Sequence, residues 1–264
     1  MNNVFLSVLI PTFNRPDNLR NCLNSLLSQD WQVSYEVIIS EDNYDNESIT
    51  RNILKEFPMM PIKFFIQKKN LGMFENWNFL IKEANGEYFT ILNDDDILLP
   101  SWASVLSEIN GKQMLGVLSI ENSLKETIQK HQNDTKHVFK NISFKELYWG
   151  LWTNGTLGSI FHTKSCKGMD LFNPFLYPIS DWDFYVRYIE KYGGKVSHKI
   201  SALYGRDDSA SLNKETMLKD MEKSYLFREE FITKQRLKNN LKLIFIKNLF
   251  YAKKYSICRS YIHN

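Results

Sequence analysis

The sequence predicts an α/β protein in which helices pack on an open, mostly parallel sheet. Short apolar segments typical of buried strands alternate with longer segments that carry an amphipathic helical period. Each strand and its helix together occupy about 25 to 30 residues, the usual size of a βαβ unit with a right-handed crossover. Several strand segments are followed directly by polar or acidic residues. In a parallel sheet such residues would share one edge, where ligands bind.

The first strand is expected at residues 5–10, which are apolar enough to be buried on both faces, and Pro11 ends it. A helix opens near Asn14 and carries apolar residues at i, i+3, i+4, i+7 and i+8. The pattern then repeats, with strands at residues 37–39, 62–66, 88–92, 115–120 and 196–203, and helices at 49–57, 74–84, 101–109 and from Asp181 onward. The polar segment 121–141 is expected to be a loop or a mobile flap.

The strand at residues 88–92 is followed by three consecutive carboxylates, Asp94, Asp95 and Asp96. Adjacent acids repel one another, and apolar residues flank this cluster, so it favours a compensating positive charge. A divalent cation that also binds a phosphate would supply that charge. The alternative is a solvated turn in which one acid caps the following helix.

Two other strand ends carry polar residues, with Pro11 and Thr12 after the first strand and Glu41 and Asp42 after the second. Because the carboxyl ends of parallel strands meet at one edge, these residues converge on the acidic triplet, which favours the metal and nucleotide interpretation. The sequence contains neither GxGxxG after the first strand nor GxxxxGK[ST], so the phosphates need another partner. A metal ion bound to the acidic triplet would be a suitable partner for the phosphates.

Composition is ordinary for a globular protein, with 43% hydrophobic and 24% charged residues and a net charge of +3. Residues 231–264 contain eight Lys or Arg and no acid, which leaves 25 basic residues against 30 acidic ones before them. This distribution argues against nucleic acid as a partner and indicates an anionic partner for the tail alone.

Three cysteines lie far apart and in no metal-binding spacing, which favours a reducing compartment without structural zinc. The apolar segment 4–10 is too short for a signal peptide and lacks a basic leader, and no segment approaches the roughly 20 apolar residues of a membrane span. We expect a cytoplasmic protein with at most a peripheral attachment to the membrane.

Six segments, taken together, resemble the family 2 glycosyltransferases of the GT-A fold, a Rossmann-like α/β fold. They occur in the family's order and spacing over residues 5–210. The segments are LSVLIPTFNR at 6–15, VIISEDN at 37–43, NLG at 70–72, GEY at 86–88, NDDDILLP at 93–100 and SDWD at 180–183. Two departures weaken the assignment of the nucleotide base and of the register: the usual DDGS is here EDNY at 41–44, and the usual first acid of the metal motif is Asn93.

The resemblance implies an inverting transfer of a sugar from a nucleotide diphosphate, usually UDP, to an acceptor hydroxyl, assisted by Mn²⁺ or Mg²⁺. Asp42 matches the acid that reads the uracil ring, Asp94 the residue near the ribose, Asp95 the metal ligand and Asp181 the catalytic base. The candidate nucleotide-binding residues are Pro11, Thr12, Phe13, Asn14, Arg15, Glu41, Asp42 and Asp94, and the candidate metal ligands are Asp95 and Asp96.

The base of an inverting transfer must lie opposite the leaving group, and either Asp181 or Asp183 could take the acceptor's proton. A structural alternative exists, because Ser180 and Asp183 have the spacing of a capping box and Asp181 in the first turn suits the helix dipole. His198 is a candidate additional metal ligand, although a lone histidine is more often structural. Arg206 is a candidate diphosphate ligand or a surface ion pair.

The aromatic residues near the candidate base in the sequence are Trp149, Trp152 and Trp182. They either stack on an acceptor sugar or belong to the hydrophobic core. The tail from Lys234 to Arg259 mixes eight cations with apolar residues at imperfect helical spacing. We expect either a surface helix attracted to anionic lipid or a helix packed on the body or on a partner subunit.

We therefore expect a GT-A domain over residues 1–210, with a nucleotide-binding half at 1–100 and an acceptor half at 101–210, followed by a helical basic extension at 211–264. The expected reaction moves a sugar from a nucleotide-diphosphate donor to a hydroxyl of a glycan or lipid-linked acceptor, in surface polysaccharide synthesis. The alternatives are a metal-dependent sugar-phosphate nucleotidyltransferase and a non-catalytic glycan-binding relative. An oligomer is compatible with the sequence.

Overall fold

A computed structural model describes residues 4–121, 137–147 and 155–205, together with scattered helical residues between 215 and 229. The expectations for Trp149, Trp152, Arg206, most of segment 121–141 and the basic tail fall outside the described residues. Within the described part of the chain, no helix is long and apolar enough to cross a membrane.

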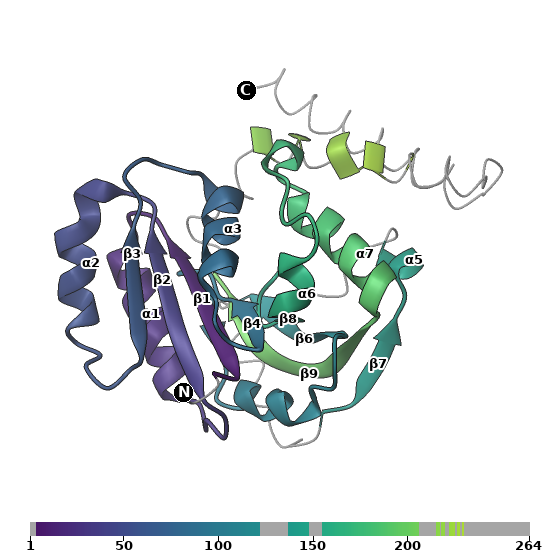
Figure 1. Ribbon diagram of the computed structural model, residues 1–264, viewed down its shortest axis with the longest axis horizontal. Coiled ribbons are helices and arrows are strands. Elements are labelled where there is room, and N and C mark those ends of the chain that lie inside the picture. The colour runs from purple at the N-terminus through teal and green to yellow at the C-terminus, as the bar shows by residue number, and fades with distance from the viewer. Residues whose placement is uncertain are drawn as a thin grey trace, which may run out of the picture.

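The first half alternates strands and helices as the sequence predicts (Figure 1). The elements are β1 (Leu6–Thr12), α1 (Pro16–Leu27), β2 (Tyr35–Glu41), η1 (Tyr44–Asn46), α2 (Glu47–Leu54), β3 (Ile62–Ile66), α3 (Met73–Glu83) and β4 (Tyr88–Ile91). Strand β1 pairs in parallel with both β2 and β4, and β2 pairs in parallel with β3. The carboxyl ends of these strands therefore lie at one edge.

The second half extends the same sheet with antiparallel as well as parallel pairs. Its elements are β5 (Ile97–Leu98), η2 (Trp102–Glu108), β6 (Met114–Glu121), β7 (Phe139–Ile142), α5 (Phe144–Leu147), β8 (Ile160–His162), α6 (Thr163–Lys167), η4 (Pro174–Leu176), α7 (Ser180–Tyr192) and β9 (Gly194–Tyr204). The strand order is β3-β2-β1-β4-β8-β6-β9-β5, with β7 also pairing with β9. The predicted α/β class is confirmed.

Two local expectations need correction within the described residues. The helix predicted at 101–109 is the 3-10 helix η2, whose Trp102 is fully buried and donates its indole N–H to the Gly158 carbonyl at 3.1 Å. The polar segment 121–141 ends in β7, which pairs with β9. Residues 139–142 form a strand because their backbone groups pair with β9. Their own sequence has only a weak strand pattern, so the strand could not be predicted from it.

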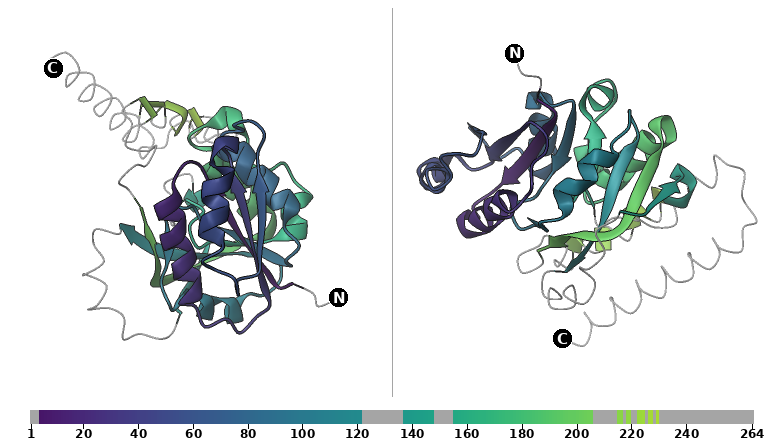
Figure 2. Two further views of the ribbon diagram at one scale, coloured as in Figure 1. Left: turned by 90° about the vertical axis from the view of Figure 1, so that its left-hand side faces the viewer. Right: turned by 90° about the horizontal axis from the view of Figure 1, so that it is seen from below.

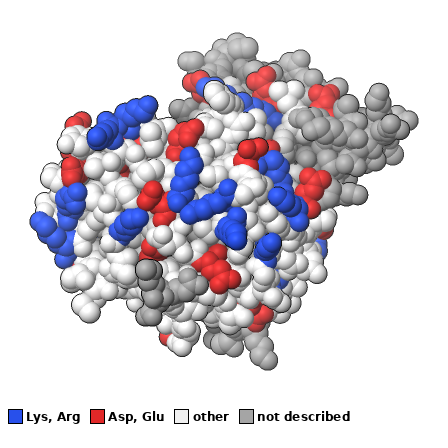
Figure 3. Space-filling model, in the orientation of Figure 1, with Lys and Arg blue, Asp and Glu red and all other residues white. Residues whose placement is uncertain are grey.

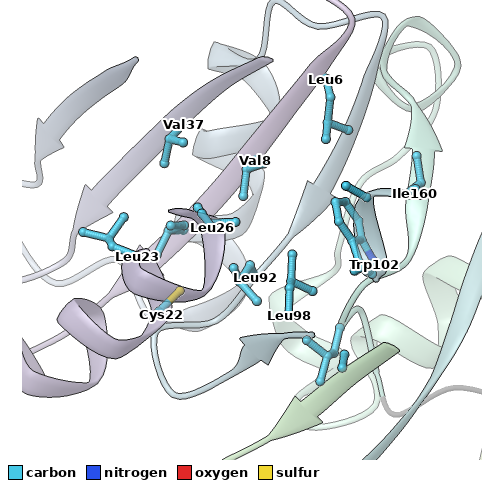
Figure 4. Close-up of a cluster of buried hydrophobic side chains, with 14 of the residues drawn as sticks. Leu6, Val8, Cys22, Leu23, Leu26, Val37, Leu92, Leu98, Trp102 and Ile160 are labelled. Carbon is cyan, nitrogen blue, oxygen red and sulfur yellow. The ribbon is translucent and has the colours of Figure 1, made fainter. Parts of the chain in front are cut away.

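Helices cover both faces of the sheet (Figure 2). Alternate residues of β1 point to opposite faces, so Leu6 and Val8 pack with α1 on one face and Leu9 packs with α3 on the other. Figure 4 shows the first cluster, in which Cys22 and Leu23 of α1 face the strands. Burial on both faces explains why the strand sequences are continuously apolar.

Lysine, arginine and acidic side chains are mixed across the face shown in Figure 3. On this face neither sign forms a continuous field. The distribution gives no support there to nucleic acid as a partner, because a nucleic-acid-binding surface concentrates basic side chains.

Gly86 lies where the chain enters β4, and a side chain there would collide with β1. A Cβ atom built on Gly86 would be 2.6 Å from the Ser7 backbone nitrogen and 2.8 Å from the Leu6 carbonyl carbon. We expect Gly86→Ala to lower the free energy of unfolding by about 1 to 3 kcal/mol, because rigid backbone must move. Urea denaturation measures this change.

The matched control is Gly168→Ala, where the nearest contact of a Cβ atom would be an ordinary 3.4 Å. We expect this variant to be neutral or slightly stabilising. Equal stability of the two variants would contradict the close approach of Gly86 to β1.

Candidate functional site

The polar and acidic residues at the carboxyl ends of β1, β2 and β4 are brought together at the common edge, as the sequence predicts. The backbone N–H of Asp42 donates to the Thr12 carbonyl at 2.9 Å. The hydroxyl of Thr12 donates to Asp94 Oδ2 at 2.8 Å. Thr12 therefore links the end of β2 to the acidic turn after β4.

Arg15 bridges two acids of this turn. Its Nη1 atom lies 3.0 Å from Asp95 Oδ2 and 3.4 Å from Asp94 Oδ1. The preceding residue, Asn14, has a φ of +57°, a backbone conformation that only a minority of non-glycine residues adopt. The Asn46 side chain donates to Asn14 Oδ1 at 3.0 Å and fixes that conformation.

Glu41 and Asp42 are buried and hold neighbouring loops. Glu41 accepts hydrogen bonds from the Thr50 hydroxyl at 2.9 Å and from the Asn14 backbone N–H at 3.4 Å. Asp42 accepts from the backbone N–H groups of Leu71 at 2.7 Å and Gly72 at 2.9 Å, just before α3. Burial raises the pKa of both carboxyls. Each Asp42 oxygen has a second lone pair with which to accept from a ligand.

Asp96 is turned into the protein. It accepts hydrogen bonds from the Gly205 backbone N–H at 3.2 Å and from the Asn93 side chain at 3.0 Å. A Cβ atom at Gly205 would lie only 2.2 Å from the Asp95 carbonyl oxygen, so glycine is required for this contact. Asp96 thus joins the acidic turn to the end of β9.

Asn93, the departure from the usual family motif, has a structural explanation. Its amide donates to Asp96, whereas a carboxylate at this position would face Asp96 with the same charge. Burial and the neighbouring Asp95 raise the pKa of Asp96 to about 8, and burial raises that of Asp94 to about 6.

Asp181 lies in the first turn of α7 and reaches the same edge through the segment 155–159. A Cβ atom at Gly155, which has a φ of +59°, would be 3.2 Å from Asp181 Oδ2. The Tyr185 hydroxyl donates to the Gly155 carbonyl at 2.7 Å, and Leu157 forms a bridge with Ile91 at the end of β4. Sequence reasoning missed Gly155 and Tyr185, because only the fold brings them to Asp181.

The other candidates lie elsewhere. Asp183 pairs with Arg187 at 2.8 Å, and Arg187 also donates to the Asp170 and Leu171 carbonyls. The structure does not support the alternative of a capping box at Ser180, because α7 has Ile179 as its N-cap and the Ser180 hydroxyl has no hydrogen-bond partner among the described residues.

His198 is exposed near the middle of β9, whereas the acidic turn contacts the far end of that strand at Gly205. The structure therefore does not bring His198 to the acids. Trp182 is buried and donates its indole N–H to the Leu147 carbonyl at 2.7 Å, so it belongs to the core.

Within the described residues no group of three or more His, Cys, Asp or Glu side chains could hold a metal ion alone. Asp94 and Asp95 nevertheless fit one mode of binding. Mg²⁺ and Mn²⁺ prefer oxygen ligands, and such ions are often held by one or two carboxylates together with substrate phosphates. The chain would then supply only part of the coordination shell.

Comparison with known protein families matches residues 7–165, more than half of the chain, to glycosyl transferase family 2, and the chain belongs to that family. A curated relative is the GalNAc(5)-diNAcBac-PP-undecaprenol beta-1,3-glucosyltransferase of Campylobacter jejuni. It is 38% identical over 106 residues, which are 39% of this chain and 33% of the relative. The match thus spans about a third of that relative's length.

Two solved structures share the fold. Residues 1–349 of S. aureus TarS, in complex with UDP-GlcNAc, have a TM-score of 0.61 at 19% identity, over 84% of this chain and 66% of that TarS fragment. The mannosyltransferase PcManGT of Pyrobaculum calidifontis, in complex with GDP-Man and Mn²⁺, has a TM-score of 0.61 at 11% identity, over 93% of this chain and 69% of that protein. The GT-A fold predicted from the sequence is confirmed.

Burial of Asp96 predicts a specific pH dependence in the presence of chelator. Because its pKa is raised from 3.8 to about 8, Asp96 stabilises the fold fully below about pH 4, and this contribution is lost as the pH rises through 8. We expect the melting temperature of wild type to fall over this range. Asp96→Asn should flatten the fall and be more stable than wild type above pH 8, leaving the smaller slope due to Asp94, Asp42 and Glu41.

Asp45→Asn, which removes one exposed acid, is the control and should keep the wild-type slope. The measurement is thermal unfolding at constant ionic strength. A wild-type melting temperature that rises steadily from pH 5 to 9 would contradict the burial of an acid in this turn.

Proposed function

We propose that the protein is a metal-dependent, inverting glycosyltransferase that moves a sugar from a UDP-sugar to a hydroxyl of a glycan or lipid-linked acceptor, in the synthesis of a surface glycan. One observation carries the proposal: Thr12, Arg15, Asp94 and Asp95 are in contact at the edge where the β2 end and the Asp181 segment also meet. Family membership supplies the reaction class.

Two features of this edge support a nucleotide donor. Phe13 follows β1 with 50% of its surface exposed, so its ring is accessible for stacking on a base. Asp42 lies directly after β2. Each of its carboxylate oxygens accepts one hydrogen bond from the loop before α3 and keeps one lone pair with which to accept from a nucleotide. The UDP-GlcNAc complex of TarS, which has the same fold, favours UDP as the nucleotide.

Asp95 is the proposed metal ligand, with Asp94 beside it. A bound Mn²⁺ or Mg²⁺ would stabilise the negative charge that develops on the diphosphate as it leaves the anomeric carbon. The Mn²⁺ complex of PcManGT is consistent with this assignment. Asp96, although a metal candidate from the sequence, bonds to Gly205 and Asn93 and is better placed to hold the turn in shape.

Asp181 is the proposed base. As the acceptor oxygen bonds to the anomeric carbon and the bond to the diphosphate breaks, the acceptor's proton passes to an Asp181 oxygen. The backbone N–H of Trp182 donates to Asp181 Oδ1 at 2.8 Å, which fixes the carboxylate. Gly155 lets the backbone approach Oδ2 closely, because a Cβ atom there would lie 3.2 Å from that oxygen.

The start of the C-terminal extension contacts the acceptor half. Lys223 Nζ donates to the Phe175 carbonyl at 2.6 Å, and the ring of Phe227 lies 5.6 Å from that of Trp182. This segment therefore packs beside the loop that leads to Asp181. A lipid-linked acceptor, the class named for the Campylobacter jejuni relative, is our proposal for this side, with the basic tail at the membrane surface.

A thermal-shift screen of nucleotides tests the donor and the metal together. We expect UDP and UDP-sugars to raise the melting temperature by several degrees with Mn²⁺ and by little with chelator, because the ligand binds only the folded state. GDP and ADP are the comparison nucleotides. A shift that ignores chelator, or a preference for another base, would overturn that part of the proposal.

Asp181→Asn tests the base. We expect it to lower kcat by about 100-fold or more while UDP binding is kept, since it removes a proton acceptor without changing shape. Asp183→Asn is the matched control two residues further along, and its turnover should stay within a few-fold of wild type. Donor consumption in a coupled UDP-release assay gives both rates. Near-normal turnover in Asp181→Asn would move the base elsewhere.

A further inference from the structure

Arg15 already supplies a positive charge to the acids that the proposed metal would bind. Its Nη1 atom lies 3.0 Å from Asp95 Oδ2 and 3.4 Å from Asp94 Oδ1. Asp94 is almost completely buried by its surroundings, and the side chain of Asp95 is 18% exposed. Two carboxylates this poorly hydrated need a nearby cation, and the guanidinium provides one.

The backbone presents Arg15 to the acids in a fixed way. Asn14 has its positive φ and is held by Asn46 and by Glu41. On the other side Pro16 begins α1 and fixes its own φ. The side chain of Arg15 is itself 30% exposed, so it lies partly at the surface of the protein.

We propose that Arg15 is the resident counter-charge of the Asp94–Asp95 pair, that a divalent cation displaces it, and that the displaced guanidinium then binds the diphosphate of the donor. The inference rests on the proposed function, whose metal and donor it connects. Arg15 thereby couples metal binding to nucleotide binding.

The distances predict that Arg15 and a divalent cation compete for Asp95. A divalent cation would bind an Asp95 oxygen at about 2.0 to 2.2 Å, and the guanidinium already lies 3.0 Å from Oδ2 of that residue. Two cations so close repel each other strongly in a site with little water. A metal without nucleotide must therefore separate Arg15 from Asp95, and no diphosphate is present to offset the loss of that ion pair.

The charge of the nucleotide predicts that the metal and the nucleotide bind cooperatively. A diphosphate brings several anionic oxygens, and arginine binds such groups through two parallel N–H donors. When metal and diphosphate arrive together, Arg15 exchanges carboxylate partners for phosphate partners. The metal and the nucleotide should then each raise the affinity of the other by the same factor, because such coupling is reciprocal.

The experiment measures Mn²⁺ affinity by electron paramagnetic resonance and UDP affinity by calorimetry, for wild type, Arg15→Met and Arg15→Lys. We expect Arg15→Met to bind Mn²⁺ alone about 10-fold more tightly than wild type, a difference of about 1.4 kcal/mol. The factor by which UDP strengthens Mn²⁺ binding should shrink by a similar amount. Arg15→Lys should lie between the two.

Arg20→Met is the matched control. It removes the same charge from within α1, five residues after Arg15, but Arg20 pairs with Asp17 and Glu56 away from the acidic turn. We expect its Mn²⁺ affinity to stay within about two-fold of wild type, since exposed charges at a distance are screened. If Arg20→Met changed the Mn²⁺ affinity as much as Arg15→Met does, the effect would come from the net charge of the protein, and the inference would be overturned.

Failure of this inference is distinguishable from failure of the proposed function. If wild type binds UDP with Mn²⁺ but Arg15→Met binds Mn²⁺ alone no more tightly, the inference is wrong and the function stands. If wild type binds no nucleotide while Arg15→Met gains Mn²⁺ affinity, the competition stands and the donor proposal falls. If neither protein binds Mn²⁺ under any condition, both are overturned. Circular dichroism confirms that the variants are folded.

Discussion

The site depends on one electrostatic constraint, which is that carboxylates from neighbouring strand ends are crowded at a single sheet edge with little water. Burial raises the pKa of Glu41, Asp42, Asp94 and Asp96. Hydroxyls, backbone N–H groups, an amide and the Arg15 guanidinium compensate these charges. Each compensating group also fixes a loop. The charge distribution and the shape of the site therefore have the same cause.

The central sheet could be predicted from the sequence because its signals are local. Continuous apolar runs and amphipathic periods mark strands and helices within a few residues, and β3 has the predicted bounds of 62–66. Parallel pairing of β1 with β2 and β4 then places Thr12, Asp42 and Asp94 at one edge. That step needs only the rule that ligand-binding residues follow the carboxyl ends of parallel strands.

The rest could not be predicted, because it depends on partners far away in the chain. Gly205 bonds to Asp96 across more than a hundred residues, and Tyr185 bonds to Gly155 across 30. No periodicity encodes such contacts, and the same holds for β7, whose polar sequence becomes a strand only beside β9. Asp96 illustrates the consequence: its residue type suggests a metal ligand, while its surroundings favour a structural role.

The acidic triplet was expected to need a positive charge, and the structure shows that the chain provides part of it through Arg15. Because Arg15 supplies part of the charge, the stage at which a metal binds can differ from that of a structural metal site. A site that can fold only around its ion holds that ion permanently, as structural zinc sites do. Here the acids have hydrogen-bond and ion-pair partners of their own, so the fold does not require the ion. Under the proposed function, metal binding would then contribute its free energy at the moment when the diphosphate arrives.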